Sequence, residues 1–327
     1  MYPKRLIIDE ARQWGIKILP VDINKSNIGY TVERVELDKN IYRYQSPNTI
    51  STGKVLSLPD ALGYAIRVGL ADIAGISKDE IKSIITNRPY LDLADFTYRS
   101  GAHWPTTQLL VEIGAFDQLH NIGKNNIGEN SKLNRRDLYI HLSELKQLNA
   151  GKSNAGQLSL ALSPGSIDSL GLPDITKAEQ ISSELQNLGI DITEHLLKKY
   201  APFLDAIGVC KSSNLVKLRS NQQVLVVGTK VALQSPPIRS GKRVLFLTLE
   251  DGFGCSDLTF FEDTQQSYAH IIKGNNLIVA RGVVRRTGAR GVSIRADAAW
   301  PLDQLYQDWL EKTNAKVPKF TETLTQI

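Results

Sequence analysis

The spacing of apolar residues divides the chain into a helical part and a last third that is rich in β-formers. Apolar residues recur every three or four positions over Leu58–Leu119, Asn134–Leu148 and Ile175–Leu188, which is the period of an amphipathic helix. Thr193–Tyr200 has the same period, and Thr193 is a suitable residue to cap its N-terminus. We therefore predict helices over these four ranges, with short turns inside the first at Gly75–Ser77 and near His103–Pro105.

The first 57 residues show a weaker pattern. Arg5–Trp14 has helical spacing, whereas Ile16–Ile23 and Tyr30–Leu37 alternate apolar and polar residues as strands do. So few apolar residues would bury little surface on their own. We expect this region to pack against the following helices or against another protein chain.

In the last third, five short β-rich runs are separated by turn residues, and Thr264–Ile272 has helical spacing. The runs are Gln223–Val231, Val244–Leu249, Ser256–Phe261, Leu277–Arg285 and Val292–Ala296. Five strands with a helix between the third and the fourth is the order of an OB-fold barrel. A small β-barrel of another type is the alternative.

Two stretches without periodicity, Asn121–Asn130 and Gly151–Pro173, are predicted to be linkers because they are rich in turn-forming residues. The second contains a glutamine followed by leucines at alternate positions, a pattern that can dock in an extended form on a partner. A flexible linker with a few leucines is the alternative. The candidate contacts of this peptide are Gln157, Leu158, Leu160 and Leu162.

The helical part contains the skeleton of a helix-hairpin-helix motif, formed by Leu70, Ile73, Gly75, Ile76 and Ile81. A glycine lets the backbone turn sharply between two helices, and amides at the start of the second helix can hold a phosphate. A second copy would consist of Leu109, Leu110, Ile113, Gly114 and Ala115. An ordinary packing corner between helices is the alternative, since Ser77 stands where the stronger motif has a second glycine. The candidate phosphate contacts are Gly75, Ile76, Ser77, Lys78 and Gly114.

The charge of the chain changes this picture mainly in the last third. The 327 residues include 39 basic and 34 acidic ones, for a formal net charge of +5. Ten basic residues against six acidic ones lie between Gln222 and Trp300, so this region holds most of the excess. A cationic surface there would bind a polyanion such as a nucleic acid. Solvated arginines without a partner are the alternative.

Alternation along the predicted strands places Arg281 and Arg285 on one face, where they could follow a sugar-phosphate backbone. Exposed phenylalanines would add a surface on which unpaired bases stack. We expect Phe253 to be exposed because it lies in a turn, and Phe246 to be buried. The candidate nucleic-acid contacts are Lys230, Arg239, Lys242, Arg243, Phe253, Arg281, Arg285, Arg286, Arg290 and Arg295.

Several enzyme classes are excluded by missing motifs. The sequence has no Asp-x-Asp pair for two-metal nucleotidyl transfer, no GxxxxGKS/T phosphate loop, no HExxH and no GxSxG. Cys210 and Cys255 lack metal-ligand spacing. We therefore predict no catalytic residues, no metal site and no cofactor in this chain. Without an apolar run of ~18–20 residues or a signal peptide at Met1, it is expected to be cytoplasmic, with no membrane partner.

Specific stretches of the chain carry a family resemblance: Tyr2–Asn24, Ile66–Gly75, Ile113–Asp117, Val231–Arg243, Phe246–Asp251, Phe260–Asp263 and Arg281–Gly288. In this order they resemble the late fingers, the tandem helix-hairpin-helix region and the OB domain of the bacterial C-family DNA polymerases of the α-subunit type. The error-prone branch is the most similar. The resemblance extends from Tyr2 to about Trp309.

The resemblance implies that the hairpins grip duplex DNA and that the OB barrel contacts single-stranded template. It also implies that Gln157–Leu162 lies where replicative relatives carry a sliding-clamp-binding peptide, although Ala161-Leu162 differs from the aromatic ending of many such peptides. The family's phosphoesterase-like domain and its palm, with the metal-binding aspartates, have no counterpart here. Mg²⁺ would belong to that palm, and this chain would be a split-gene product that joins a separate catalytic chain, or a truncated remnant.

We therefore predict an α+β multidomain fold in which a tandem helix-hairpin-helix region precedes a five-stranded OB-fold β-barrel. The expected segments are a fingers-like remnant (1–57), the hairpins (58–120), a linker and helix (121–174), a helical connector (175–215), the OB domain (222–300) and a tail (301–327). The predicted function is a non-catalytic DNA-binding module of an error-prone polymerase, in replication or translesion repair synthesis. The alternative is an independent single-stranded-DNA-binding accessory protein in repair.

Overall fold

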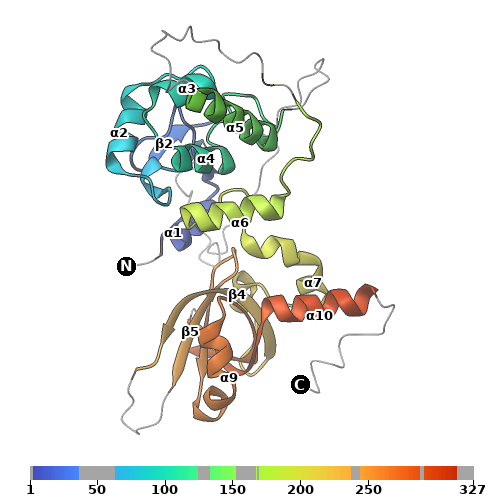
Figure 1. Cartoon of the computed structure of the whole chain (residues 1–327). Coiled ribbons are helices and arrows are strands. Elements are labelled where there is room, and N and C mark those ends of the chain that lie inside the picture. Colours follow the sequence, from blue (N-terminus) through green and yellow to red (C-terminus); the bar gives the residue numbers. More distant parts are fainter. Residues whose placement is uncertain are drawn as a thin grey trace. The chain divides into compact units, whose positions relative to one another are not determined.

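The computed structural model describes residues 3–36, 63–123, 133–151, 167, 169–236, 244–287 and 291–314. They belong to two compact units of the chain, shown in Figure 1. Of the described residues, the barrel unit comprises those within 3–13 and 195–314, and the hairpin unit comprises those within 14–36 and 63–194. The first helix, α1 (Lys4–Gln13), thus belongs to the barrel unit, although the hairpin unit follows it directly in the chain.

A three-stranded sheet opens the hairpin unit. Strands β1 (Lys17–Leu19), β2 (Thr31–Arg34) and β3 (Tyr64–Arg67) lie in the order β1-β3-β2, with β1 parallel and β2 antiparallel to β3. The two predicted strands are confirmed with shorter bounds, but β3 lies in a range predicted to be helical. Its amides and carbonyls bond to strands on both sides, so long-range pairing overrides the local pattern.

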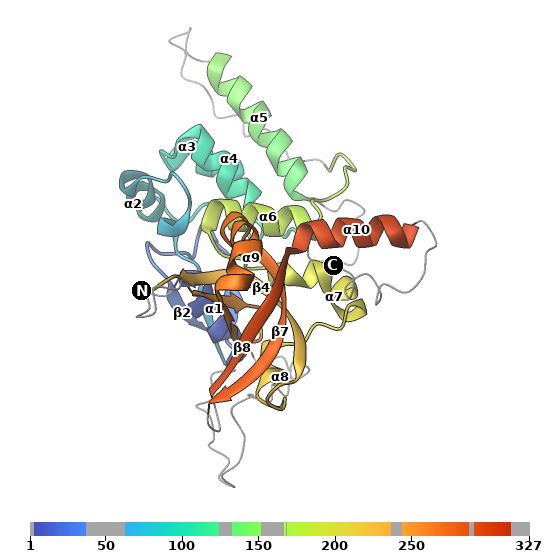
Figure 2. The ribbon, with the colours of Figure 1, turned by 90° about the horizontal axis from the view of Figure 1, so that it is seen from below.

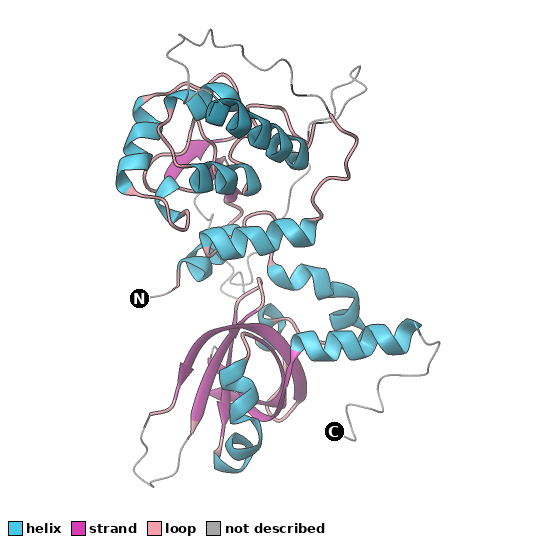
Figure 3. Ribbon diagram, in the orientation of Figure 1, coloured by secondary structure: helices cyan, strands magenta, loops and turns pink. Residues whose placement is uncertain are grey.

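The helices of the hairpin unit follow β3 (Figure 3): η1 (Leu70–Asp72), α2 (Lys78–Thr86), α3 (Leu93–Arg99), α4 (Trp104–Glu112), α5 (Arg135–Gly151) and α6 (Lys177–Leu188). Helices α5 and α6 confirm the ranges predicted from the sequence. Buried aromatic side chains hold the unit together, and the ring of Phe96 meets those of Tyr90 and Phe116 edge to face at 4.9 and 5.0 Å.

The last third forms a closed barrel with the strand order β4-β5-β6-β8-β7. Its elements are β4 (Gln223–Gln234), β5 (Leu245–Glu250), β6 (Cys255–Phe260), α9 (Glu262–Gly274), β7 (Leu277–Thr287) and β8 (Gly291–Pro301). Neighbouring strands are antiparallel except β6 and β8, and the long β7 and β8 lie side by side in Figure 2. The five strands and the helix between the third and fourth confirm the predicted OB-type order and α+β class.

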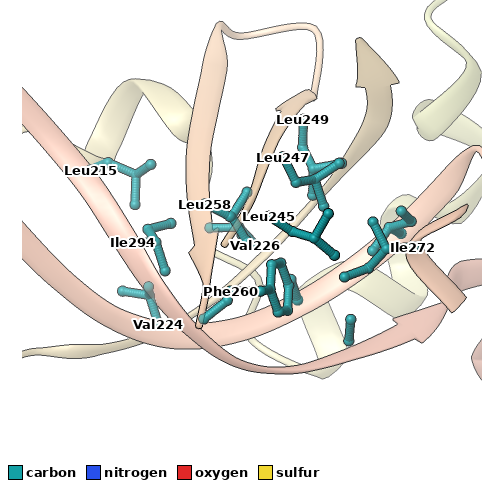
Figure 4. Packing of buried hydrophobic residues seen from close by; sticks show 14 of the residues in the cluster. Leu215, Val224, Val226, Leu245, Leu247, Leu249, Leu258, Phe260, Ile272 and Ile294 are labelled. Carbon is teal, nitrogen blue, oxygen red and sulfur yellow. The ribbon is translucent and has the colours of Figure 1, made fainter. Parts of the chain in front are cut away.

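Aliphatic side chains and Phe260 fill the interior of the barrel (Figure 4). Leu245, Leu247 and Leu249 of β5 all belong to this core. Because side chains alternate along a strand, the residues between them face outward. Ile272 of α9 and Leu215, the last residue of α8 (Ser212–Leu215), complete the core.

A second apolar cluster covers part of the outside of the barrel. It joins side chains of β4, β7 and β8 to η3 (Leu196–Tyr200), α7 (Ala201–Ala206) and α10 (Leu302–Asn314). The predicted tail therefore begins with a helix that the sequence analysis did not identify. Tyr306 of α10 meets the ring of Tyr200 edge to face at 4.9 Å, which anchors this helix.

The predicted cap at Thr193 is wrong. His195 caps η3 instead, because its Nδ1 accepts the backbone N–H of Leu197 at 3.2 Å. The hydroxyl of Thr193 donates to Glu184 Oε1 at 2.5 Å, in the hairpin unit. Thr193 has a side chain that can cap a helix, but its hydroxyl is bonded to the carboxylate of Glu184 in α6 instead.

Candidate nucleic-acid interface

An aromatic and a basic side chain lie on one line across the outer face of the barrel. Phe246 of β5 is paired with Thr259 of β6, and Thr259 is paired with Arg295 of β8. Their neighbours Leu245, Leu258 and Ile294 point into the core, so these three residues point outward. We call Phe246, Thr259 and Arg295 the outer row.

The outer row is accessible to a ligand. Phe246 is 42% exposed and Arg295 is exposed, while Thr259 between them is half-buried. The guanidinium of Arg295 lies 5.5 Å from the ring centroid of Phe261, which is itself exposed and begins α9 as its cap residue. Phenylalanine rings offer stacking surfaces for bases and the guanidinium offers donors for a phosphate, so this face has the chemistry of a single-strand site.

The expectation that Phe246 is buried is wrong, whereas the exposure expected for Phe253 is confirmed. Both rings are 42% exposed, and Phe260 is the phenylalanine that fills the core. The β-rich pattern identified the strand, but the inner and outer faces were assigned incorrectly. The leucines at 245, 247 and 249 were the signal that could have placed Phe246 outside.

Arg281 and Arg285 lie on the outer face of β7, because Ile278, Ala280 and Val284 of that strand belong to the core. Their surroundings differ. Arg281 Nε donates to Asp297 Oδ1 at 2.8 Å, whereas Arg285 is exposed opposite Ser293 of β8. The positive charge of Arg281 is therefore paired with the carboxylate of Asp297 within the protein.

Two further candidates donate to backbone carbonyls. Arg286 Nη1 donates to the backbone carbonyl of Leu218 at 3.2 Å. Lys230 Nζ donates to the carbonyls of Ile272 and Lys273 at 2.8 and 3.1 Å, and partial burial lowers the pKa of its ammonium. A lysine in this position satisfies the last carbonyls of α9, so we assign Lys230 to the stability of that helix end.

Several predicted contacts lie outside the described residues and stay predictions. They are Arg239, Lys242, Arg243 and Arg290 of the OB region and Gln157, Leu158, Leu160 and Leu162 of the clamp peptide.

The first hairpin holds a carboxylate at the start of its second helix. Gly75 has φ +77°, and Ser77 caps α2. Glu80 Oε2 accepts the backbone N–H of Ser77 at 2.9 Å, and Glu80 Oε1 accepts from His103 N at 3.0 Å and Thr106 Oγ1 at 2.7 Å. Burial alone would raise the pKa of Glu80, but these hydrogen bonds lower it to about 2. The amide of Ser77 is therefore already bonded to an internal anion, while Lys78 is exposed and Ile76 is half-buried.

The glycine of the second hairpin makes room for an ion pair. Gly114 has φ +81°, and a Cβ there would lie 2.1 Å from an Arg135 guanidinium nitrogen. Arg135 is buried, and its Nη2 donates to Asp117 Oδ2 at 2.7 Å while its Nη1 donates to the Glu112 carbonyl at 3.0 Å. Sequence reasoning missed Arg135, because it follows the linker and nothing local links it to Gly114.

In the barrel unit, Asp9, His195 and Glu250 bring three potential metal-ligand atoms within 4.8 Å of one another. The hydrogen bonds of the imidazole argue against a metal. Its Nδ1 accepts the backbone N–H of Leu197 at 3.2 Å, and its Nε2 lies 3.0 Å from Glu250 Oε2 and 3.3 Å from Arg5 Nη2, so protein groups already engage both ring nitrogens. Asp9 is also paired with Arg12 at 2.7 Å. We infer that Asp9, His195 and Glu250 serve to hold α1 against the barrel.

The comparisons with known proteins agree with this architecture. A helix-hairpin-helix motif model matches residues 15–126, and an OB-fold nucleic acid binding domain model matches residues 224–302. The Error-prone DNA polymerase of Symbiobacterium thermophilum is 30% identical over 295 residues, which cover 83% of this chain and 25% of that protein. Those of Rhizobium meliloti (polymerase 1) and Bdellovibrio bacteriovorus are each 25% identical, over 86% and 92% of this chain and 24% and 26% of theirs.

This chain is a homologue of the error-prone DNA polymerases. The resemblance found in the sequence is thereby confirmed, and the chain spans about a quarter of the length of these relatives. Within the described ranges, the chain has no helix that is both long and apolar enough to cross a membrane. The outer row lies within the part matched by the OB-fold model.

Proposed function

We propose that this chain is the DNA-binding C-terminal module of an error-prone C-family DNA polymerase α subunit. It holds the single-stranded template and the duplex during replication or translesion repair synthesis, and it acts in the cytoplasm. The chain contributes no catalytic residues of its own. A separate catalytic polymerase chain supplies the palm and its Mg²⁺, and the peptide Gln157–Leu162 binds the sliding clamp.

The observation that carries the proposal is the outer row on an OB barrel whose chain is homologous to error-prone polymerases. Base-to-ring stacking tolerates any sequence, because every base has a π-face. The guanidinium of Arg295, which lies beside the ring of Phe261, can neutralise a phosphate without reading a base. Both properties suit a polymerase that must hold a template of any sequence, damaged or not.

The basic residues set how strongly binding depends on salt. Each phosphate neutralised on a single strand contributes roughly −0.7 to the slope of log affinity against log salt. Arg285, Arg286 and Arg295 are exposed on the barrel, and Arg239, Lys242, Arg243 and Arg290 lie in the chain between the strands. We expect these residues to form the cationic track that guides the strand past the outer row.

The helix-hairpin-helix match supports a contact with duplex DNA. In the first hairpin the amide of Ser77 is bonded to Glu80. We therefore expect the exposed ammonium groups of Lys78 and Lys82, rather than that amide, to meet the phosphates.

The test is a binding titration of a fluorescent single-stranded oligonucleotide by anisotropy at several salt concentrations. Replacing Arg285 and Arg286 by Ala is expected to weaken binding and to flatten the salt slope by up to about 1.4. The double variant Lys17→Ala with Lys25→Ala removes the same charge from exposed positions of the hairpin unit and serves as the matched control. Equal slopes for the two double variants would contradict the proposed track.

A pulldown separates the proposal from its main alternative. Recovery of a catalytic polymerase chain with this protein supports a polymerase module. Tight binding of single-stranded DNA without any polymerase partner would favour an independent accessory protein in repair.

A further inference from the structure

At the turn between β5 and β6, an aromatic ring lies against a lysine ammonium, and this pair is separate from the outer row. Phe253, in the turn Asp251–Gly254, is 42% exposed. The ammonium of Lys211 lies 4.4 Å from the centroid of its ring. Lys211 precedes α8 and lies outside the range matched by the OB-fold model. A residue of the connector thus contributes to the surface of the barrel.

One buried carboxylate holds both partners of this pair in place. Asp251 Oδ2 accepts the backbone N–H of Ser212 at 2.7 Å, and Asp251 Oδ1 accepts the Ser212 hydroxyl at 2.6 Å. The same Oδ1 accepts the backbone N–H of Phe253 at 2.9 Å. Because Ser212 follows Lys211 directly, the carboxylate fixes the backbone next to the lysine and the backbone of the phenylalanine together.

The backbone of the turn is equally constrained. Gly252 has φ +82° and Gly254 has φ +148°, values that residues with a Cβ rarely adopt. A Cβ at Gly252 would lie 3.0 Å from the His195 ring, and one at Gly254 would lie 3.1 Å from the Ser212 hydroxyl. An exposed ring held this firmly loses little conformational entropy when a ligand stacks on it.

The pair has the two properties that a nucleotide requires. An exposed aromatic ring is a platform for a base, and an adjacent ammonium can meet the phosphate that follows it. Phe246 and Glu250 are four residues apart on β5, about 13 Å at the rise of a strand. A strand of the ~4–16 nucleotides that an OB fold engages is long enough to reach from the outer row to this turn.

We propose that Phe253 and Lys211 form a second contact for single-stranded DNA, in which a base stacks on the Phe253 ring and the Lys211 ammonium pairs with a neighbouring phosphate. Asp251 and Ser212 are positioning residues for this contact. The proposal rests on the single-strand binding proposed above and extends it to the connector that precedes the barrel.

The experiment measures affinity for a fluorescent oligothymidylate with the full chain at several salt concentrations. Phe253→Leu is expected to weaken binding by about 5- to 150-fold, the range found for the loss of one stacked base. Lys211→Gln is expected to reduce the salt slope by about 0.7. Lys217→Gln is the matched control, because Lys217 is an exposed lysine between α8 and β4 whose ammonium bonds to Asn214 Oδ1 at 3.1 Å.

Phe253→Trp gives a readout that a purely structural role would not produce. Stacking of a base on the new indole quenches its fluorescence beyond any change seen in the unmodified chain. Absence of this quenching, or equal slopes for the Lys211 and Lys217 variants, overturns the second contact while the binding of the unmodified chain still supports the proposed function. If the unmodified chain does not bind the oligonucleotide, both proposals fail.

Discussion

Glu80 is expected to stabilise the hairpin unit strongly, and Glu80→Gln tests this. The carboxylate is buried and accepts hydrogen bonds from Ser77, His103 and Thr106. A glutamine keeps the shape but turns one acceptor into a donor, which then faces another donor. Leaving such a buried group unsatisfied costs about 1–3 kcal/mol.

The pKa of Glu80 gives a second measure of the same effect. Its fall from 4.5 to about 2 corresponds to about 3 kcal/mol of folding free energy at most. Because the folded pKa lies below the unfolded one, this contribution is complete above about pH 5 and is lost as the pH falls toward 2. Glu80→Gln should therefore lower stability at neutral pH and weaken its dependence on pH in that interval.

The assay is urea unfolding of the full chain, followed by far-UV circular dichroism at a series of pH values. Asp79→Asn is the control, because it removes one negative charge from the same helix turn at an exposed position and should cost only a few tenths of a kcal/mol. If Glu80→Gln and Asp79→Asn gave the same stability, or curves that run parallel from pH 5 to 2, the reasoning would be refuted.

Two other predictions concern stability and binding. Gly114→Ala should destabilise the chain by more than about 1–2 kcal/mol, because an alanine there would have a left-handed backbone and would also clash with Arg135. Gly75→Ala is the comparison, because Gly75 has φ +77° but open space around it, so only the backbone cost applies. Thermal unfolding of the two variants should show the smaller loss of stability for Gly75→Ala. Lys230→Met should cost about 0.5–1 kcal/mol, through the lost hydrogen bonds at the end of α9, and leave the salt slope of single-strand binding unchanged. A reduced slope for Lys230→Met would instead assign that lysine to the DNA contact.

The barrel and most helices could be predicted because their signals are local. Strands β4 to β8 each carry β-formers bounded by turn residues, and α9 carries a helical period between the third and fourth runs. Such patterns depend only on neighbours along the chain. The segment of β3 was assigned incorrectly, since four residues decide little until two other strands pair with them.

The candidate site was predictable in its residue types but not in its arrangement. The excess of arginines and the phenylalanines of the last third indicate a nucleic-acid surface. Which of the basic residues face a ligand depends on partners distant in the sequence, namely Asp297 for Arg281 and the α9 carbonyls for Lys230. The exposure of Phe246 follows instead from the inward leucines beside it on β5, a local signal that the sequence analysis did not use.

The sequence by itself determined the order of elements, the place of the positive charge and the family resemblance, because period, composition and motifs are properties of the chain alone. Only the tertiary structure decided which charges are neutralised internally, that Lys211 lies against Phe253, and that a carboxylate bonds to the hairpin amide. These facts depend on distances between residues far apart in the chain, and such distances exist only once the backbone has folded.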